Sequence, residues 1–497
     1  MRLPASTVKE LESADLSVND RVRLRCRIAQ RYEQAGDYEA AREALGEFWQ
    51  GIGVRPDLEG LHDANKAGLL SRVGALTGWL GSLRQVEGAQ EAAKDLISES
   101  LAVFQLRGLK SKAGEARSDL ALCYWREGAY DEARIMLQEA FRDIDERNIE
   151  QRAITLIRQA FVERETNRLH EALRFHHTAK PLFEKIEDHL LTAHFHHEFA
   201  NVLNRLSSAE NRGDYVDLAL IEYTAASFHF EHAGHERFQA CVENNIGYLI
   251  GTIGRFAAAH EHLDRAQVLM TRLKDNVHLA QVDETRAGIL LAEGRNVEAE
   301  KTARAAVLAL DKGDEHSLLA EALTTHGIAL ARLSHPEAAR TAFERAIEAA
   351  ERAGDFTRAG IAALTMVEQL GGQLSTIEVC ETIDHAGTLL DKTDDLETLR
   401  RLAKAAFEVL FLVQSADWKN FSLRKAVRKF EANLISKALK EGGGSVTRAA
   451  RLLGFNHHQS LSAMLAARHS ALLNERKPAR KRHKHLMKHS KRKKQSD

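Results

Sequence analysis

The chain has 497 residues, more than one compact core usually supports, so several domains or a repeat array are expected. Only 5 prolines and 6% aromatic residues in an alanine-rich sequence predict an all-α protein. Between Lys419 and Asp497 there are 21 Lys and Arg against 4 Asp and Glu, a net charge of +17, whereas residues 1–418 carry −18. This division favours a polyanionic partner at the basic end.

The sequence shows no targeting or membrane segment and no cysteine framework. The N-terminal residues lack the apolar core of a signal peptide, and no run of about 18 apolar residues occurs. The 4 cysteines lie far apart, without metal-ligand spacing, and are predicted to be small buried hydrophobic residues in a reducing compartment. We therefore expect a cytoplasmic protein without membrane contact.

Most of the chain repeats one helical unit, seen clearly from Gly247 to Ala266. A helix containing small Gly247 reaches a turn at Gly254, and Phe256, Ala259 and Ala266 then fall on one face of a second helix. This unit resembles the tetratricopeptide repeat. With the turn residue as anchor, five of eight spacings are 40 residues and one is 39. The anchors are Gly36, Gly88, Gly128, Asn167, Asp214, Gly254, Gly294, Ser334 and Leu374.

Two alanines accompany most anchors, five and twelve residues after the turn. They are seven residues apart, hence on one helical face, where only a small side chain lets an antiparallel helix approach. The two series are Ala133, Ala172, Ala219, Ala259, Ala299 and Ala339, and Ala140, Ala179, Ala226, Ala266, Ala306, Ala346 and Ala386. A period of 40 instead of 34 implies longer helices, and another αα-solenoid phase stays open.

In chain order, the pattern predicts about nine helical pairs in residues 1–418. The first pair spans 22–49, the last spans 364–390, and residues 396–413 form a closing helix. Longer spacings mark insertions around 51–56 and 207–212, and Pro336 is expected at a helix start. The groove of such a solenoid is expected to bind a protein or peptide.

A short helical domain is predicted at residues 419–474. A basic amphipathic helix with Phe430, Leu434 and Ala438 on its inner face leads to Gly442–Gly444. Ser445 is a helix cap, Gly454 ends that helix, and the spacing from Ala450 to Gly454 suits a helix-turn-helix.

The following helix would be the recognition helix. Asn456 is its predicted cap, with Gln459 three residues later in the manner of a capping box, and Leu461, Met464 and Leu465 form its inward stripe.

Residues 430–465, with the AARLLG block and the glycine turn, resemble the C-terminal helix-turn-helix of the Fis type. The resemblance implies binding to double-stranded DNA, with a homodimer reading two half-sites. It assigns base-edge contacts to Asn456, His457, His458, Gln459 and Ser460, and backbone contacts to Thr447, Arg448, Arg451 and Arg468.

Residues 475–497 carry 11 basic residues in 23 and are predicted to be a disordered tail. The tail either neutralises phosphates non-specifically, or serves as a solubilising end or an import signal.

Histidines cluster at His176, His177, His189, His194, His196 and His197. A metal site, a pH-sensitive packing role and simple surface polarity all remain open, and the nearby carboxylate Glu198 alone does not favour metal. No cofactor is expected.

No P-loop, GxSxG or HExxH motif occurs, so an enzyme is not expected. The leading hypothesis is a DNA-binding regulator with a protein-interaction solenoid. The alternative is a solenoid adaptor whose basic end binds RNA or acidic partners non-specifically.

Overall fold

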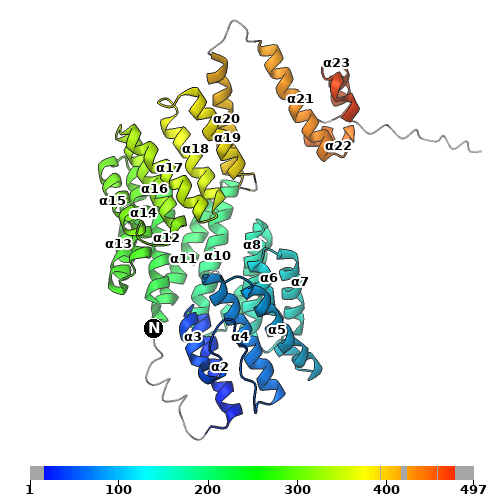
Figure 1. The fold of residues 1–497 in the computed structure, drawn as a ribbon, viewed down its shortest axis with the longest axis vertical. Helices are drawn as coiled ribbons and strands as arrows, with labels where there is room; N and C mark the ends of the chain where they lie inside the picture. The colour runs from blue at the N-terminus through cyan, green and yellow to red at the C-terminus, as the bar shows by residue number, and fades with distance from the viewer. Residues whose placement is uncertain are drawn as a thin grey trace, which may run out of the picture. The chain divides into compact units, whose positions relative to one another are not determined.

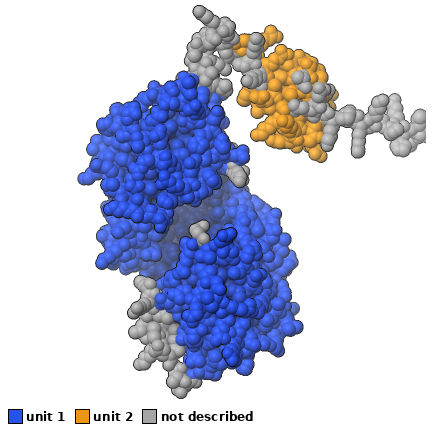
Figure 2. Space-filling model, in the orientation of Figure 1, with its two compact units in different colours: residues 1–407 blue, residues 408–497 orange. Residues whose placement is uncertain are grey.

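The computed structural model of the chain describes residues 16–84, 86–391, 393, 395–415, 422–455 and 457–475. These residues belong to two compact units, 1–407 and 408–497 (Figure 2). Every regular element in the described ranges is a helix (Figure 1), and none is long and apolar enough to span a membrane. The predicted boundary at residue 418 and tail residues 476–497 lie outside the described ranges.

The first unit is a succession of antiparallel helical pairs, as predicted. The nine pairs in the described part are α2 (Val18–Gln34) and α3 (Tyr38–Leu45), α4 (Asp63–Leu83) and α5 (Ala89–Leu106), α6 (Lys110–Arg126) and α7 (Tyr130–Asp143), α8 (Ile149–Glu165) and α9 (Leu169–Phe183), α10 (His189–Glu210) and α11 (Gly213–His232), α12 (Glu236–Thr252) and α13 (Phe256–Leu273), α14 (Asn276–Ala292) and α15 (Asn296–Leu310), α16 (His316–Arg332) and α17 (Pro336–Arg352), and α18 (Phe356–Leu370) and α19 (Thr376–Leu389).

The pairs stack into a solenoid in which the first helix of each pair lines the inner face. Helices α4, α6, α8 and α10 contact one another in sequence, and so do α12, α14, α16 and α18. Each pair alone has one apolar face uncovered, and stacking buries it in a continuous core. Residues 153–289 supply the largest cluster of that core.

The recurring alanines lie where the helices of a pair meet. All thirteen alanines of the two predicted series are fully buried. Gly327 of α16 has the same role, because a Cβ there would lie 2.8–3.0 Å from the ring of Phe343 on α17. Small residues therefore set the distance between paired helices, and Pro336 starts α17 as predicted.

Most predicted turn anchors adopt the left-handed conformation that ends a helix. Positive φ angles occur at Gly36, Gly88, Gly128, Asn167, Gly254, Gly294 and Ser334. The prediction is wrong at Asp214, which lies in the first turn of α11, while Asn211 is the left-handed residue (φ 52°). Leu374 lies between α18 and α19 without a positive φ.

The two insertions have different structures. The first is a connection after α3 that contains the short helix η1 (Gly46–Phe48), and it buries Phe48, Trp49 and Leu61 against the first pairs. The second contains no long loop, because α10 extends through Glu210 and only Asn211 and Arg212 precede α11. That insertion lengthens a helical pair.

Helix α20 (Leu396–Ser415) occupies the region of the predicted closing helix. Arg401 connects it to α18, since its guanidinium donates to the Thr365 hydroxyl (2.9 Å) and to the Glu368 carboxylate (2.8 Å).

Candidate DNA-binding module and groove of the solenoid

A glycine turn joins the first two helices of the C-terminal module, α21 (Leu423–Glu441) and α22 (Val446–Leu452). Gly443 and Gly444 have positive φ angles (60° and 78°) that other residues rarely adopt. Gly442 lies so close to α22 that an added Cβ would be 3.2 Å from the backbone nitrogen of Ala449. The Ser445 side chain accepts from the backbone N–H of Arg448, so it caps α22 as predicted.

The core of this module confirms one part of the prediction and corrects another. Leu461 and Leu465 are fully buried and Met464 is partly buried, as predicted for the inward stripe of α23 (His458–Arg468). Phe430 and Leu434, predicted on the inner face of α21, are 58% and 44% exposed. Among the described side chains of α21, Ile435 and Leu439 are buried, and so is Ala438, as predicted.

A sharp bend at Gly454 (φ 73°) separates α22 from α23. Helix α23 begins at His458, with His457 as its cap and no side-chain hydrogen bond to the helix start. The predicted capping box from Asn456 is therefore wrong in register, because the cap position falls one residue later. Asn456 itself lies outside the described residues.

The other residues predicted to contact DNA are all exposed. The exposed residues are Thr447, Arg448 and Arg451 on α22, and His457, His458, Gln459, Ser460 and Arg468 at or in α23. Arg468 forms an ion pair within the module, because its guanidinium lies 3.6 Å from the Glu431 carboxylate. Its backbone carbonyl accepts from Arg428 Nε (2.9 Å), which fixes the end of α23 against α21.

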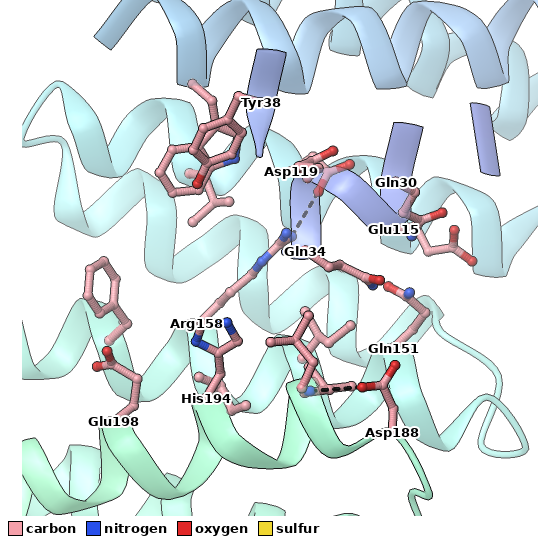
Figure 3. A pocket seen from close by; sticks show the side chains of 18 of the residues that line it. Gln30, Gln34, Tyr38, Glu115, Asp119, Gln151, Arg158, Asp188, His194 and Glu198 are labelled. Carbon is pink, nitrogen blue, oxygen red and sulfur yellow. Dashed lines mark hydrogen bonds and ion pairs between the residues drawn. The ribbon is translucent and has the colours of Figure 1, made fainter. Parts of the chain in front are cut away.

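A cavity of about 340 Å³ opens on the inner face of the solenoid between α2, α4, α6, α8 and α10 (Figure 3). Tyr38 and Trp79 stack at 4.9 Å on one wall. Arg158 crosses the cavity wall and donates to Asp119 (2.9 Å) and to the Ser118 hydroxyl (2.8 Å). Five carboxylates and two arginines line the cavity, so its charge is negative. It combines apolar surface with acidic groups.

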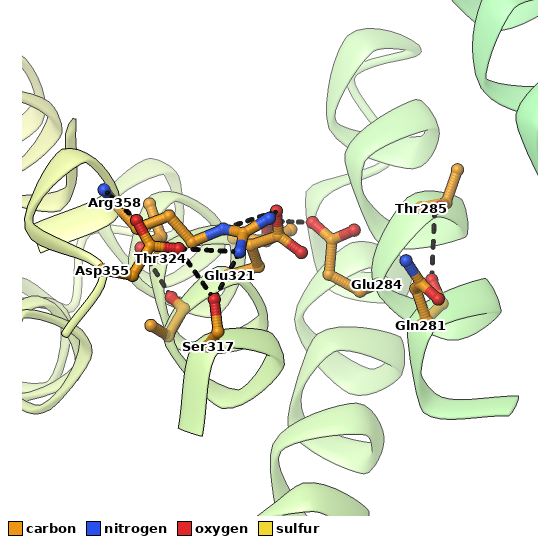
Figure 4. Close-up of polar contacts among 10 residues, drawn as sticks. Gln281, Glu284, Thr285, Ser317, Glu321, Thr324, Asp355 and Arg358 are labelled. Atoms are coloured by element: carbon orange, nitrogen blue, oxygen red, sulfur yellow. Dashed lines mark hydrogen bonds and ion pairs between the residues drawn. The ribbon is translucent and has the colours of Figure 1, made fainter. Parts of the chain in front are cut away.

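A second groove of about 660 Å³ runs across α12, α14, α16 and α18 (Figure 4). Arg358 donates to Glu321 (2.8 Å) and to Asp355 (3.0 Å), which fixes both carboxylates. Glu284 faces the same network and accepts from the Thr325 hydroxyl (2.6 Å). Burial, and then the nearby charge of Glu321, raise the pKa of Glu284 to about 7. The Arg358 guanidinium partly offsets this rise in pKa, although no ion pair with Glu284 is found among the described residues.

The groove residues were missed by the sequence analysis, although a signal was available. Polar residues recur along the inner helices with the same period of 40 that places the alanines, for example at Asn245, Thr285 and Thr325, and at Gln281 and Glu321. A search for repeated polar positions on the first helix of each pair would have found them.

The histidine-rich region has two different environments, and surface polarity is wrong for part of it. His176 is 1% exposed and stacks on Phe199 at 5.0 Å. Burial lowers the pKa of His176 to about 3 and that of His194 to about 4, so both rings are neutral at pH 7. His189, by contrast, is exposed at the start of α10.

Comparison with known sequences supports the C-terminal module. The sequence profile described as "Bacterial regulatory protein, Fis family" matches residues 426–457, which include most of α21, the glycine turn and α22. No curated protein sequence matches the chain.

Several solved structures are similar to this chain at low identity. Aspartyl phosphate phosphatase F from Bacillus subtilis is 12% identical, with a TM-score of 0.48, over 78% of this chain and 95% of that one. A signal-transduction ATPase with a tetratricopeptide repeat sensor from Pyrococcus horikoshii is 14% identical, with a TM-score of 0.47, over 77% and 54%. The quorum sensor NprR from B. thuringiensis is 12% identical, with a TM-score of 0.41, over 67% and 98%.

The stacked helical pairs carry the buried alanines of the tetratricopeptide pattern, and the bent pair of helices after the glycine turn lies in the segment that matches the Fis family. The chain joins a tetratricopeptide-like helical solenoid to a C-terminal helix-turn-helix of the Fis type.

Proposed function

We propose that this chain is a cytoplasmic DNA-binding regulator whose solenoid binds a peptide or protein partner. The observation that carries the proposal is the exposed start of α23. The side chains at this start, just after the bend at Gly454, are exposed in His457, His458, Gln459 and Ser460. In a helix-turn-helix, the N-terminal residues of the second helix meet base edges in the major groove. Glutamine is suited to adenine.

Residues on either side of the start of α23 are proposed to bind the DNA backbone. Thr447, Arg448 and Arg451 on α22 are exposed and offer hydrogen bonds to phosphate oxygens. Arg468 serves the same role at the far end of α23. A homodimer reading two half-sites about 34–36 Å apart completes the proposal, because an isolated helix-turn-helix covers only a few base pairs.

The inner face of the solenoid is proposed to bind the regulatory partner. Its first cavity offers the stacked Tyr38 and Trp79 to an apolar side chain, and Gln34 and Gln151 to a peptide backbone. Its second groove offers Glu284 to a basic group. An extended peptide with apolar and basic side chains fits this combination of surfaces.

Selection from random duplex DNA tests the proposal. We expect an enriched motif with the full chain, and loss of that enrichment with Asn456→Ala and Gln459→Ala. Arg448→Ala should weaken binding to all sequences by a similar factor, because phosphate contacts carry no sequence information. Leu434→Ala, an exposed position on α21, is the matched control and should retain the motif.

The alternative is a solenoid adaptor whose basic end binds RNA or acidic partners without sequence preference, and the net charge of +17 from residue 419 onward favours it. Binding that is independent of sequence, falls steeply with salt, and survives Gln459→Ala would establish the adaptor and remove the regulator.

A further inference from the structure

The groove across α12, α14, α16 and α18 is lined by more carboxylates than cations. Glu284 on α14 points toward Glu321 on α16, and Asp355 caps the start of α18 (Figure 4). Among the described lining residues the only cation is Arg358. Its guanidinium is already engaged, because it donates to Glu321 (2.8 Å), to Asp355 (3.0 Å) and to the Ser317 hydroxyl. With Glu284 ionised, the groove therefore has an excess of negative charge.

The Glu284 carboxyl has one hydrogen-bond partner among the described residues. It accepts from the Thr325 hydroxyl (2.6 Å), a neutral donor. The charged or titratable groups that face it are Glu321 from α16, Arg358 from α18 and Tyr248 from α12. Burial raises the pKa of Glu284 to about 7, the Glu321 charge adds to the rise, and Thr325 and Arg358 oppose it. An ionised carboxylate at this position would have unused capacity to accept hydrogen bonds.

An independent feature of the same groove also points to a donor. Asn244 on α12 is 8% exposed, and its side-chain oxygen has no hydrogen-bond partner in the described part of the chain. Tyr248, one turn later on that helix, lines the groove and is 53% exposed. An aromatic ring face attracts a cation, and buried acceptors attract charged N–H groups. The groove thus combines the three features that bind an organic cation: a carboxyl, a free acceptor and a ring.

We infer that this groove binds an ammonium or guanidinium group, carried by a basic side chain of the partner peptide, and that Glu284 releases a proton as this group enters. The inference rests on the proposed function and adds the chemical group that is recognised. Both cations carry several N–H donors and no acceptor, which suits the Glu284 carboxylate and the Asn244 oxygen. The proton passes to solvent, and the cation balances the charge that the proton leaves behind. Arg358 stays paired and holds Glu321 and Asp355 in place.

The affinity for such a cation should depend on pH. In the empty groove Glu284 is mostly protonated below its pKa of about 7, so a cation has to displace the proton. The bound state then holds fewer protons than the free state, and a rise in pH favours binding. The affinity should fall by up to about tenfold for each pH unit below 7 and change little above pH 8.

Peptide selection tests which group is recognised. The full chain is used to select from a random heptapeptide library displayed on phage at pH 8. We expect enrichment of Lys or Arg at one position, and loss of that enrichment with Glu284→Gln. Glu298→Gln is the matched control and should retain it, because this substitution removes one carboxylate at an exposed position of α15, where Glu298 pairs with Arg295.

Calorimetric titration tests the release of the proton. The full chain is titrated with spermidine, and with an enriched peptide, at pH 6, 7 and 8 in two buffers of different ionisation enthalpy. About one proton should be released per cation bound at pH 6. Glu284→Gln should weaken binding at pH 8 by about tenfold or more and abolish both the proton release and the pH dependence. Tyr248→Phe should bind like the parent chain, whereas Tyr248→Leu should weaken binding by about two- to fivefold.

The two experiments separate this inference from the proposed function. Enriched peptides without Lys or Arg, or equal binding by the parent chain and Glu284→Gln, would overturn the cation site and leave a peptide-binding solenoid. Spermidine that binds with the expected dependence on Glu284, without any enriched peptide, would support the cation site, assign it to a free amine and remove the peptide partner. Failure of both experiments would remove both proposals.

Discussion

Gly327 marks the place where the first helix of a pair meets the second. The ring of Phe343 occupies the space that any side chain at residue 327 would need. Other inner glycines have room, as at Gly288 of α14, where an added Cβ would have no neighbour within 4 Å. The space around an inner glycine therefore decides whether alanine can replace it without loss of stability.

Gly327→Ala should lower the free energy of unfolding by about 1–2 kcal/mol, because the overlap with Phe343 outweighs the roughly 1 kcal/mol that alanine gains in a helix. Gly288→Ala should instead stabilise the chain by about 0.5–1 kcal/mol. Urea denaturation of both variants measures the difference. Equal effects of the two substitutions would contradict the packing argument.

Glu284 should make stability depend on pH. Its pKa is raised to about 7 in the folded chain, from 4.5, so the folded state disfavours its charged form. The unfolded carboxyl ionises first as pH rises, and stability is lost between about pH 4.5 and pH 7. Glu284→Gln should therefore raise the free energy of unfolding at pH 8, on the order of 1–3 kcal/mol, and much less at pH 5.

Glu298→Gln is the control for this pH dependence. Glu298 is exposed on α15, and its hydrogen bond to Arg295 lowers its pKa, which is the opposite direction. Its substitution should not stabilise the chain at either pH. A Glu284→Gln variant that is no more stable at pH 8 than the parent would show that ionisation of the Glu284 carboxyl does not destabilise the folded chain.

At the scale of single elements, α21 shows why hydrophobic periodicity alone predicted the wrong buried face of a helix. Phe430 and Leu434 form one apolar stripe on this helix, and Ile435 and Leu439 form another. Both stripes satisfy the period of an α-helix, so the sequence cannot tell which of them faces α22 and α23. The short helix α22 needed no such choice, because its two alanines, Ala449 and Ala450, lie together on one face and both are buried, with Val446 packed beside them.

Leu439→Ala should destabilise the C-terminal module by about 2–5 kcal/mol, because the Leu439 side chain is fully buried. Leu434→Ala should cost less than about 0.5 kcal/mol. Amide hydrogen exchange of α22 and α23 in the full chain reports both values. Comparable loss of protection in the two variants would mean that the exposed stripe of α21 also supports the module.

Repetition made the solenoid easier to predict than the module. The alanine series and most turn anchors were correct because the same constraint recurs in each pair and stands out from the surrounding sequence. Asp214 was wrong because a lengthened α10 moved the turn to Asn211. The groove was missed because the polar residues of any single inner helix look like a solvated face, and only their recurrence every 40 residues distinguishes them.

At the scale of the whole molecule, charge is divided between the ends of the chain. Residues 1–418 carry −18 and residues 419–497 carry +17. A DNA duplex is therefore attracted by one part and repelled by the other. Repulsion between exposed charges is screened by salt, and it weakens as the Debye length falls from about 10 Å at 0.1 M salt to about 3 Å at 1 M.

Deletion of residues 1–418 should tighten DNA binding at low ionic strength, and the difference from the full chain should shrink as salt is added. Fluorescence anisotropy with one labelled duplex across a salt series measures this. Deletion of residues 476–497 removes 11 basic residues and should reduce the salt dependence of binding. Equal or weaker affinity after the first deletion would exclude a repulsive role for the solenoid.

The turn after α2 reaches well beyond its neighbours in sequence. Phe238 on α12 places its ring 3.4 Å from the position that a Cβ on Gly36 would occupy, so the first pair touches the sixth. The turn between α2 and α3 therefore lies against α12, although four helical pairs lie between them along the chain. The Phe238 ring thus holds the start of the solenoid beside Tyr38, which lines the cavity proposed to bind a peptide.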